Sequence, residues 1–207
     1  NAAEVMAEAR KIPGVIGATQ HAEGVVMILA GNKPSFPAIH GIDLVHVEEV
    51  VPLNQYLQLG TLDDLDDDSV ILSRDLARSL GVGIGSRIEL YTPLLLEKMR
   101  HDEVLLPREF RVCGLFEIGH SQLDGNLVIC TLRAMQDLYG LGSAVHGVSL
   151  RLEAGADPDA VAAQLNRRLA HGQRALAWMD TNRDFLFILQ LEKNMLFFLL
   201  LFIVLVA

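Results

Sequence analysis

The chain has 207 residues, enough for one domain or two small subdomains with a buried core. Its 17 Lys and Arg residues are outnumbered by 26 Asp and Glu residues, which gives a net charge of −9. An acidic chain without a Lys/Arg stripe excludes nucleic acid as the expected partner. The positive mean hydropathy is inflated by an apolar C-terminal tail, so the rest has the composition of an ordinary soluble domain.

The first half of the chain predicts alternating strands and helices. Residues 2–11 are rich in Ala and Glu and precede Pro13-Gly14, which predicts a helix that ends there. Two β-rich stretches flank the polar residues 20–23, which predicts a hairpin that turns at this break. The other elements predicted in this half are strands at 37–42, 70–72 and 87–91, a partly helical stretch at 53–59, and a helix at 74–80 capped by Ser73.

Two motifs in this half look like ligand sites but lack the required context. The aspartate-rich stretch at 63–68 lacks the Gly and the distal Glu of a calcium loop, so we expect a solvated turn. The glycine cluster at 81–85 follows a helix and precedes a strand, the reverse of a dinucleotide-binding fingerprint. We expect it to end the helix and turn the chain.

The second half continues the interleaving of strands and helices. Thr131 is placed to cap a helix that ends at Tyr139, and Pro158 opens an amphipathic helix that runs to residue 169. Strands are predicted at 110–118, 126–130, 145–152 and 174–178. The whole pattern predicts an α+β fold with mixed sheets and helices in two subdomains.

No catalytic constellation is evident in the sequence. The serines lack the context of a nucleophile elbow, and the seven histidines never occur as HxxxH or HExxH. His40, Asp43 and His46 are spaced for a conceivable metal site, with scattered structural histidines as the simpler interpretation. We therefore expect no enzymatic activity, no cofactor and no metal in this chain.

The two cysteines lie in separate apolar segments without a CxxC spacing. Cys113 and Cys130 can pair only if their segments are neighbouring strands. Otherwise they are buried free thiols.

The C-terminal segment indicates a membrane helix. Residues 195–207 are all apolar, whereas a core helix of a soluble protein normally shows one polar face. Thirteen helical residues reach about 20 Å, and a bilayer core is about 30 Å thick. We therefore expect a membrane span that is truncated partway, with a C-terminal core helix as the alternative. Residue 1 is Asn and no signal segment precedes the first helix, so we expect an excised fragment.

A single helix is predicted to lead from the folded domain into this span. The sequence TNRD at 181–184 fits a capping box, and neither Gly nor Pro follows up to residue 207. A continuous helix can transmit a displacement that a Gly/Ser linker would absorb, although a plain anchor is equally compatible. We expect the polar residues 192–194 at the headgroup level. The residues assigned to this membrane-entry helix are Thr181, Asp184, Glu192, Lys193 and Met195.

Residues 92–109 predict a protruding hairpin between two strands. Two apolar arms flank the charged tip at 97–103. Burying a Leu is worth about 1.5–3 kcal/mol, so the leucines of the arms must dock on this domain, on another subunit or on another protein. The candidate contact residues are Leu94, Leu95, Leu96, Met99, Val104, Leu105, Leu106 and Pro107.

Several stretches, in this order and spacing, resemble the periplasmic domains of the lipoprotein-releasing ABC permeases of the LolC and LolE family. They are VILS at 70–73, FRVCGLFE at 110–117, LVI at 127–129, WMDTN at 178–182 and QLEKNM at 190–195. The resemblance covers essentially the whole chain. Related domains occur in macrolide exporters of the MacB type and in FtsX-like permeases.

The resemblance implies a MacB-like periplasmic core domain at 1–180, between the first two spans of a permease, with residues 181–207 entering the second span. It places the chain at the inner membrane of a Gram-negative-type bacterium. The implied partners are a cytoplasmic ABC ATPase subunit, a second permease subunit in a homo- or heterodimer, a periplasmic lipoprotein chaperone, lipoprotein cargo and membrane lipids. ATP hydrolysis would belong to the ATPase subunit.

In LolC-type permeases the region that corresponds to residues 92–109 carries a hook-like hairpin that binds the chaperone. The resemblance therefore implies a partner-binding hairpin here, with a hairpin packed on its own domain as the alternative. At the level of function, the alternatives are a related permease for export or force transmission and a membrane-tethered binding domain.

Overall fold

The structure is a computed structural model that describes residues 2–93, 95, 107–119, 126–170, 172–181 and 183–206. Its internal contacts divide the chain into two compact units. The first unit comprises Asn1–Lys11 and Val15–Leu152, and the second comprises Ile12–Gly14 and Glu153–Ala207. The first unit holds the β-sheet, and the second holds the C-terminal helices.

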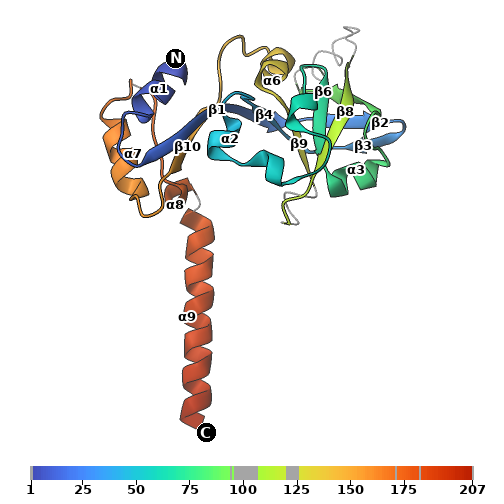
Figure 1. Cartoon of the computed structure of the whole chain (residues 1–207). Helices are drawn as coiled ribbons and strands as arrows, with labels where there is room; N and C mark the ends of the chain where they lie inside the picture. Colours follow the sequence, from blue (N-terminus) through green and yellow to red (C-terminus); the bar gives the residue numbers. More distant parts are fainter. Residues whose placement is uncertain are drawn as a thin grey trace. The chain divides into compact units, whose positions relative to one another are not determined.

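The first unit is a mixed sheet with short helices, shown in Figure 1. The helices described in it are α1 (Ala2–Ala9), α2 (Val47–Val50), α3 (Arg74–Leu80) and α6 (Leu132–Tyr139), with the 3-10 turns η1 (Leu53–Gln55) and η2 (Leu62–Asp64). The strands are β1 (Val15–Val25), β2 (Met27–Ala30), β3 (Lys33–Ser35), β4 (Ala38–Ile42), β5 (Leu57–Leu59), β6 (Ser69–Ser73), β7 (Arg87–Tyr91), β8 (Arg108–Phe116), β9 (Leu127–Thr131) and β10 (Gly147–Leu152).

Within the described residues the strands form one sheet in the order β10-β1-β4-β9-β6-β8-β7-β2-β3, with β5 pairing separately with β8. The pairs β4–β9 and β6–β8 are parallel, and the other pairs are antiparallel. The predicted class, a mixed sheet combined with several helices, is therefore confirmed.

Strands β1 to β4 form one long hairpin with a constant register. His21 faces Ile42 at its base, and Ile28 faces Ser35 near its tip. The chain reverses between β2 and β3 at Gly31, which has a φ of 59°. Glycine adopts this left-handed conformation without steric cost, as a two-residue hairpin turn requires.

The sequence prediction of a hairpin turn at residues 20–23 is wrong. These polar residues continue β1, because this strand has partners on both sides. Strand β10 pairs with Val15 to His21, and β4 pairs with His21 to Val25. Ala22 is fully buried whereas Glu23 is exposed, as expected for neighbouring residues of a strand, whose side chains point to opposite faces.

Two further predictions from the sequence are modified because a tertiary contact overrides the local pattern. The partly helical stretch predicted at 53–59 is helical at Leu53–Gln55, but Leu57–Leu59 form β5, in which Leu57 faces Phe116 of β8. Residues 174–178 were predicted as a strand. Instead, the side-chain amide of Asn166 bonds the backbone N–H and C=O of Ala175, at 2.7 and 2.9 Å. Trp178 then begins a helix.

The sheet curls because the two halves of the long hairpin pair with different neighbours. Between β4 and β2, which both belong to this hairpin, the sheet order places β9, β6, β8 and β7. Strand β4 pairs with β9, and β2 pairs with β7. The strands and the helices α3 and α6 share one buried cluster, which includes Leu76, Phe110 and Met135. A Cβ atom on Gly41 would lie 2.4 Å from the Cβ of Met135, so α6 approaches β4 this closely only over a glycine.

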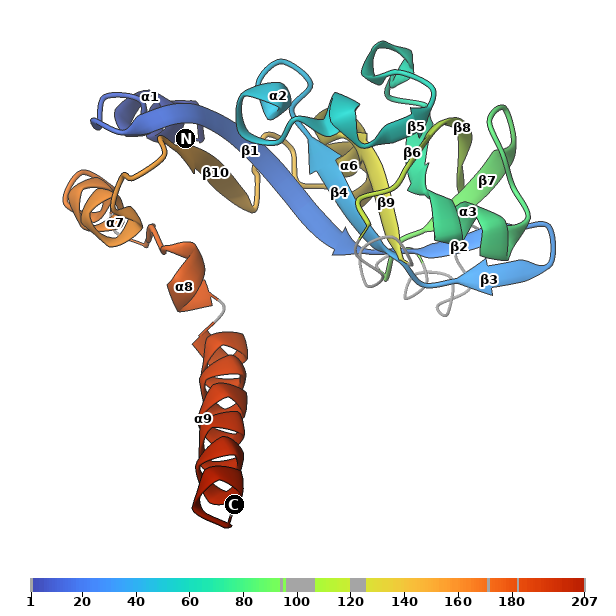
Figure 2. The ribbon, with the colours of Figure 1, turned by 60° about the horizontal axis from the view of Figure 1, so that its bottom comes forward.

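A second buried cluster lies under the connection that runs from α2 to η2, which Figure 2 shows in cyan along one side of the strands. Leu53, Leu62 and Leu65 of this connection are buried in it. Strand β9 serves both clusters, because alternate side chains point to opposite faces of a sheet. Val128 belongs to the first cluster and Ile129 to the second.

The two cysteines are buried free thiols. Cys113 lies in the second cluster and Cys130 in the first, and β6 separates their strands. Two strand spacings amount to about 9.5 Å, whereas a disulfide joins Cα atoms that are about 4.4–6.8 Å apart. Burial raises the pKa of both thiols, that of Cys130 to about 12.

The helix ends follow the predicted capping residues. The Thr131 side chain accepts the backbone N–H of Ala134 at 3.0 Å, which caps α6. Ser73 occupies the N-cap position of α3, but its hydroxyl accepts the N–H of Leu127 at 3.4 Å instead. Helix α3 ends at Gly81 as predicted.

The second unit contains the helices α7 (Pro158–Asn166), α8 (Trp178–Thr181) and α9 (Arg183–Val206). Pro158 occupies the first turn of α7, and the Asp157 side chain caps it by accepting the N–H of Asp159 at 3.0 Å. Figure 1 shows α9 as one unbroken helix.

Candidate membrane and partner-binding sites

Helix α9 has the length and composition of a membrane span. The stretch Phe187–Val204 has 18 residues, and none of it is buried within the protein. At about 1.5 Å per residue, such a stretch reaches about 27 Å, close to the 30 Å of a bilayer core. The prediction of an uninterrupted helix at this end of the chain is confirmed from Arg183 to Val206.

The charged pair Glu192 and Lys193 lies within this stretch, and both side chains are exposed. A charged side chain at the centre of a bilayer costs about 2.5–3.5 kcal/mol on insertion scales. We therefore expect this pair at the headgroup level, so that only residues 195–206 lie below it. At about 1.5 Å per residue they reach about 18 Å, which is part of a bilayer core and fits the truncated span predicted from the sequence. Thr181 ends α8 and Asp184 lies in the first turn of α9. Their side chains lie outside the described part of the chain, so the capping box stays a prediction.

The base of the predicted hairpin is formed by β7 and β8. Leu90 faces Arg108 across this antiparallel pair, close to both ends of the predicted hairpin. Thr92 is buried, and its hydroxyl accepts the backbone N–H of Leu95 at 3.2 Å, which fixes the first turn of the leading arm. Leu95 and Pro107 are half-buried.

The remaining candidate contact residues of the hairpin lie outside the described residues. They are Leu94, Leu96, Met99, Val104, Leu105 and Leu106. The protrusion of the hairpin and its role as a binding site therefore stay predictions.

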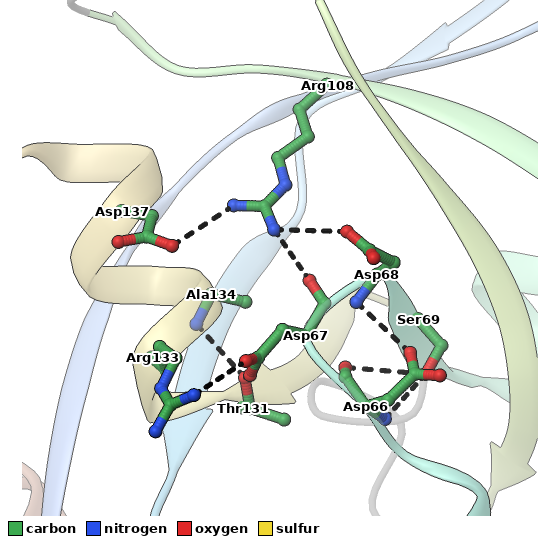
Figure 3. Close-up of polar contacts among 9 residues, drawn as sticks. All are labelled: Asp66, Asp67, Asp68, Ser69, Arg108, Thr131, Arg133, Ala134 and Asp137. Carbon is green, nitrogen blue, oxygen red and sulfur yellow. Dashed lines mark hydrogen bonds and ion pairs between the residues drawn. The ribbon is translucent and has the colours of Figure 1, made fainter.

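Arg108, the first residue of β8, is the centre of a polar network at the hairpin base (Figure 3). Its guanidinium donates to the backbone carbonyl of Asp67 at 2.9 Å and to Oδ1 of Asp68 at 3.2 Å. Its Nη1 lies 3.7 Å from Oδ2 of Asp137 on α6. The same guanidinium lies 5.0 Å from the ring centroid of Phe110. Arg108 thus joins β8 to the acidic turn and to α6.

The carboxylates of Asp66 and Asp67, next to this network, are also held by hydroxyl groups and arginines. Thr131 donates its hydroxyl proton to Oδ1 of Asp67 at 2.5 Å, and the Nη1 of Arg133 lies 3.6 Å from Oδ2 of Asp67 (Figure 3). Hydrogen bonding by Ser69, with the charge of Arg111 as a lesser cause, holds the pKa of Asp66 below its usual value. The acidic turn is therefore exposed as expected, but arginines and hydroxyls organise it.

The sequence did not reveal this network, because its members are far apart in the chain. Arg108 is 41 residues from Asp67, and Thr131 is 64 residues from it. The feature of the sequence that lies in this network is the aspartate-rich stretch at 63–68, from which only a solvated turn was expected.

His40 and His46, which the sequence offered as ligands of a metal site, make separate contacts in the structure. The Nδ1 of His46 lies 2.8 Å from Oδ2 of Asp43, whereas the Nε2 of His40 lies 3.8 Å from Oε2 of Glu23. Among the described residues, no group of three or more His, Cys, Asp and Glu side chains is arranged to hold a metal ion.

Comparison with known proteins assigns the chain to a family. Residues 1–168 match the family described as the MacB-like periplasmic core domain. The lipoprotein-releasing system transmembrane protein LolC of Neisseria meningitidis serogroup B is 26% identical over 202 residues, covering 94% of this chain and 47% of that protein. LolC of Xylella fastidiosa is 29% identical over 192 residues, with coverages of 91% and 45%. The chain thus spans about half the length of these curated relatives.

Solved structures share the fold. The extracellular domain of the noncanonic ABC-type transporter YknZ from Gram-positive bacteria has a TM-score of 0.58 at 16% identity, covering 84% of this chain and 86% of that one. The periplasmic region of MacB from Actinobacillus actinomycetemcomitans has a TM-score of 0.57 at 14% identity, with coverages of 89% and 82%.

The family match over residues 1–168, together with the similarity to LolC proteins, defines a periplasmic domain of an ABC-type permease, and the apolar helix is consistent with it. The chain belongs to the family of MacB-like periplasmic core domains, and it is a periplasmic domain of an inner-membrane permease of the LolC and MacB type. The family resemblance and the cellular location predicted from the sequence are thereby confirmed.

Proposed function

We propose that this chain is the non-catalytic periplasmic domain of a permease that releases lipoproteins from the inner membrane and passes them to a periplasmic chaperone. The observation that carries the proposal is the similarity to LolC proteins, named as parts of a lipoprotein-releasing system, over 94% and 91% of the chain. The likeness to MacB supports the fold and leaves the substrate open, because its identity is only 14%.

In this proposal residues 1–180 form the periplasmic part, and residues 181–207 carry the chain into the membrane. A cytoplasmic ATPase subunit hydrolyses ATP, and a second permease subunit completes the transporter. Helix α9 is the stiff connection, because its 24 residues run without a break. An unbroken helix passes on a displacement that a flexible linker would absorb.

The hairpin at residues 92–109 is the proposed docking site for the chaperone. Its base is ordered on both sides, by the bond from Leu95 to Thr92 and by the Arg108 network. Residues that are already held at the base lose little conformational entropy when a partner binds there. The leucines of the arms supply the apolar contact, and the charged tip keeps the unbound hairpin in solution.

The test is a pulldown of the chaperone by the full chain in detergent micelles. The variant combines Leu95→Asp with Leu105→Asp, and the matched control is Leu59→Asp, an exposed leucine of β5 that faces the opposite end of β8. Two buried leucines contribute about 1.5–3 kcal/mol each, so we expect the affinity of the double variant to fall at least roughly a hundredfold. The control should bind like the wild type.

Unchanged binding by a folded double variant would exclude the hairpin as the docking site. If the wild-type chain binds no lipoprotein chaperone at all, a related permease for export or force transmission becomes the better assignment.

A further inference from the structure

Three histidines surround one glutamate where β1 changes its partner strand. His21 is the last residue of β1 that pairs with β10 and the first that pairs with β4. Two residues further along, Glu23 faces His40 of β4, with 3.8 Å between the carboxylate and Nε2. His146 directly precedes β10. We call His21, Glu23, His40 and His146 the histidine junction.

Two imidazoles of the junction link β1 and β10, one from each side: His146, next to β10, contacts β1, and His21, in β1, contacts β10. The Nδ1 of His146 accepts the backbone N–H of Glu23 at 2.9 Å. The Nδ1 of His21 lies 3.1 Å from the hydroxyl of Ser149, a residue of β10. The backbone N–H of His146 also donates to the carbonyl of His21 at 3.0 Å. The start of β10 is therefore held by ring nitrogens as well as by strand pairing.

The bond to His146 requires a neutral imidazole. A ring nitrogen that accepts an N–H carries no proton, so the proton of this ring is on Nε2. When the imidazole takes up a second proton, both nitrogens become donors, and Nδ1–H then faces the N–H of Glu23. The hydrogen bond from Glu23 to His146 is then lost, and the positively charged imidazole faces the backbone N–H of Glu23, which is also a donor.

The other two rings increase this sensitivity. Burial lowers the pKa of His21, with His40 and His146 adding to the decrease and Glu23 opposing it. Burial also lowers the pKa of His40, again against the pull of Glu23. The Glu23 carboxylate acts on His21 and His40, and His146 acts on His21, so protonation of all three imidazoles beside this one carboxylate leaves two positive charges in excess.

Nearby charged groups are already engaged elsewhere. On α2, which packs against β1, Glu48 accepts a backbone N–H of η1 at 2.9 Å and Glu49 pairs with Arg10 at 2.6 Å. Asp43 pairs with His46 at 2.8 Å. The remaining titratable groups on elements packed against β1, β4 and β10 are Glu4 and Glu8 of α1 with the adjoining Lys11, Cys130 of β9, Arg151 of β10, and Arg133, Asp137 and Tyr139 of α6.

We infer that the histidine junction is a pH-sensitive latch: neutral imidazoles hold the first residues of β10 on β1, and protonation releases them. Strand β10 is also the strand from which the chain continues into the unit that contains α9. The latch therefore controls how firmly the sheet holds its last strand before the membrane helix.

The expected size follows from proton linkage. The latched junction binds fewer protons than the open one, so the latch is fully stable above the ordinary histidine pKa of about 6.5 and weakens as the pH falls below it. For one imidazole that titrates only when the junction is open, the opening constant rises about tenfold between pH 7.5 and pH 5.5. Two such imidazoles would raise it about a hundredfold.

The test is hydrogen exchange measured by mass spectrometry on the full chain in detergent micelles at pH 7.5 and pH 5.5, corrected for the intrinsic pH dependence of exchange. Peptides that cover residues 19–25 and 146–152 report on the latch, and a peptide of the fully buried strand β6 serves as the reference. The variant is His146→Asn, because an asparagine side-chain oxygen near the position of Nδ1 accepts the N–H at both pH values. His46→Asn is the matched control outside the junction.

We expect protection of the two latch peptides to fall at least tenfold at pH 5.5 in the wild type and in His46→Asn, while the β6 peptide is unchanged. In His146→Asn the fall should be clearly smaller. Equal protection of the wild type at both pH values would overturn the proposal, as would a fall of full size in His146→Asn. Since His146 is exposed, its substitution leaves the core intact.

Discussion

Replacing Arg108 with Ala tests whether the polar network at the hairpin base contributes to stability. The substitution removes a charged hydrogen bond to the carbonyl of Asp67 at 2.9 Å, and contacts with Asp68 at 3.2 Å and Asp137 at 3.7 Å. A hydrogen bond to a charged donor contributes about 1.5–3 kcal/mol, and each partly exposed ion pair about 0.2–1 kcal/mol. We therefore expect a loss of about 2–4 kcal/mol in the free energy of unfolding.

The assay is urea unfolding of the full chain in detergent micelles, followed by circular dichroism of the sheet. Arg108→Lys should lose about half as much, because an ammonium group does not reproduce the forked contacts of a guanidinium. The matched control is Arg87→Ala on the neighbouring β7. The Arg87 side chain is 80% exposed, and its contact with Glu109 spans 3.6 Å.

We expect the control to change the stability by less than about 0.5 kcal/mol, as is usual for exposed ion pairs. If Arg108→Ala also stays within about 0.5 kcal/mol of the wild type, the network contributes no more than an ordinary surface pair, and its role in fixing the hairpin base is refuted.

Two further predictions concern the core. Gly41→Ala should destabilise the protein by about 1–3 kcal/mol in the same assay, because the new methyl group would lie 2.4 Å from the Cβ of Met135. Gly83→Ala, with no heavy atom within 4 Å of the new methyl group, should be nearly neutral, and equal effects would contradict the close packing of α6 on β4. Cys113 and Cys130 should not react with a thiol reagent at pH 8 until the chain unfolds. Because burial raises the pKa of Cys130 from 9.0 to about 12, the free energy of unfolding should fall as the pH rises through this range, and a stability independent of pH there would refute the assignment.

Features set by short stretches of sequence were predictable. The cap at Thr131 and the end of α3 at Gly81 depend on residues within one helical turn, and both lie where the sequence placed them. The helix from Arg183 to Val206 follows from the absence of Gly and Pro and from its apolar C-terminal part. Several short stretches that resemble LolC, in the same order and spacing, were also enough to indicate the family.

Features set by pairing between distant strands were not predictable. The polar residues 20–23 continue β1 because two strands from far along the chain pair with it, and no local pattern reveals these partners. The same holds for β5, which forms only against β8. The Arg108 network and the histidine junction arise when the sheet brings together residues far apart in the chain, such as Arg108 and Asp67, or His146 and Glu23, which are 123 positions apart.

The most direct test of the proposed function is a release assay in proteoliposomes that contain the whole permease with its ATPase and a native lipoprotein. The account predicts that lipoprotein appears on the soluble chaperone only when ATP is hydrolysed, and that the Leu95→Asp, Leu105→Asp variant strongly reduces this transfer while ATP hydrolysis continues. ATP hydrolysis by the wild type without any transfer of lipoprotein to the chaperone would contradict it.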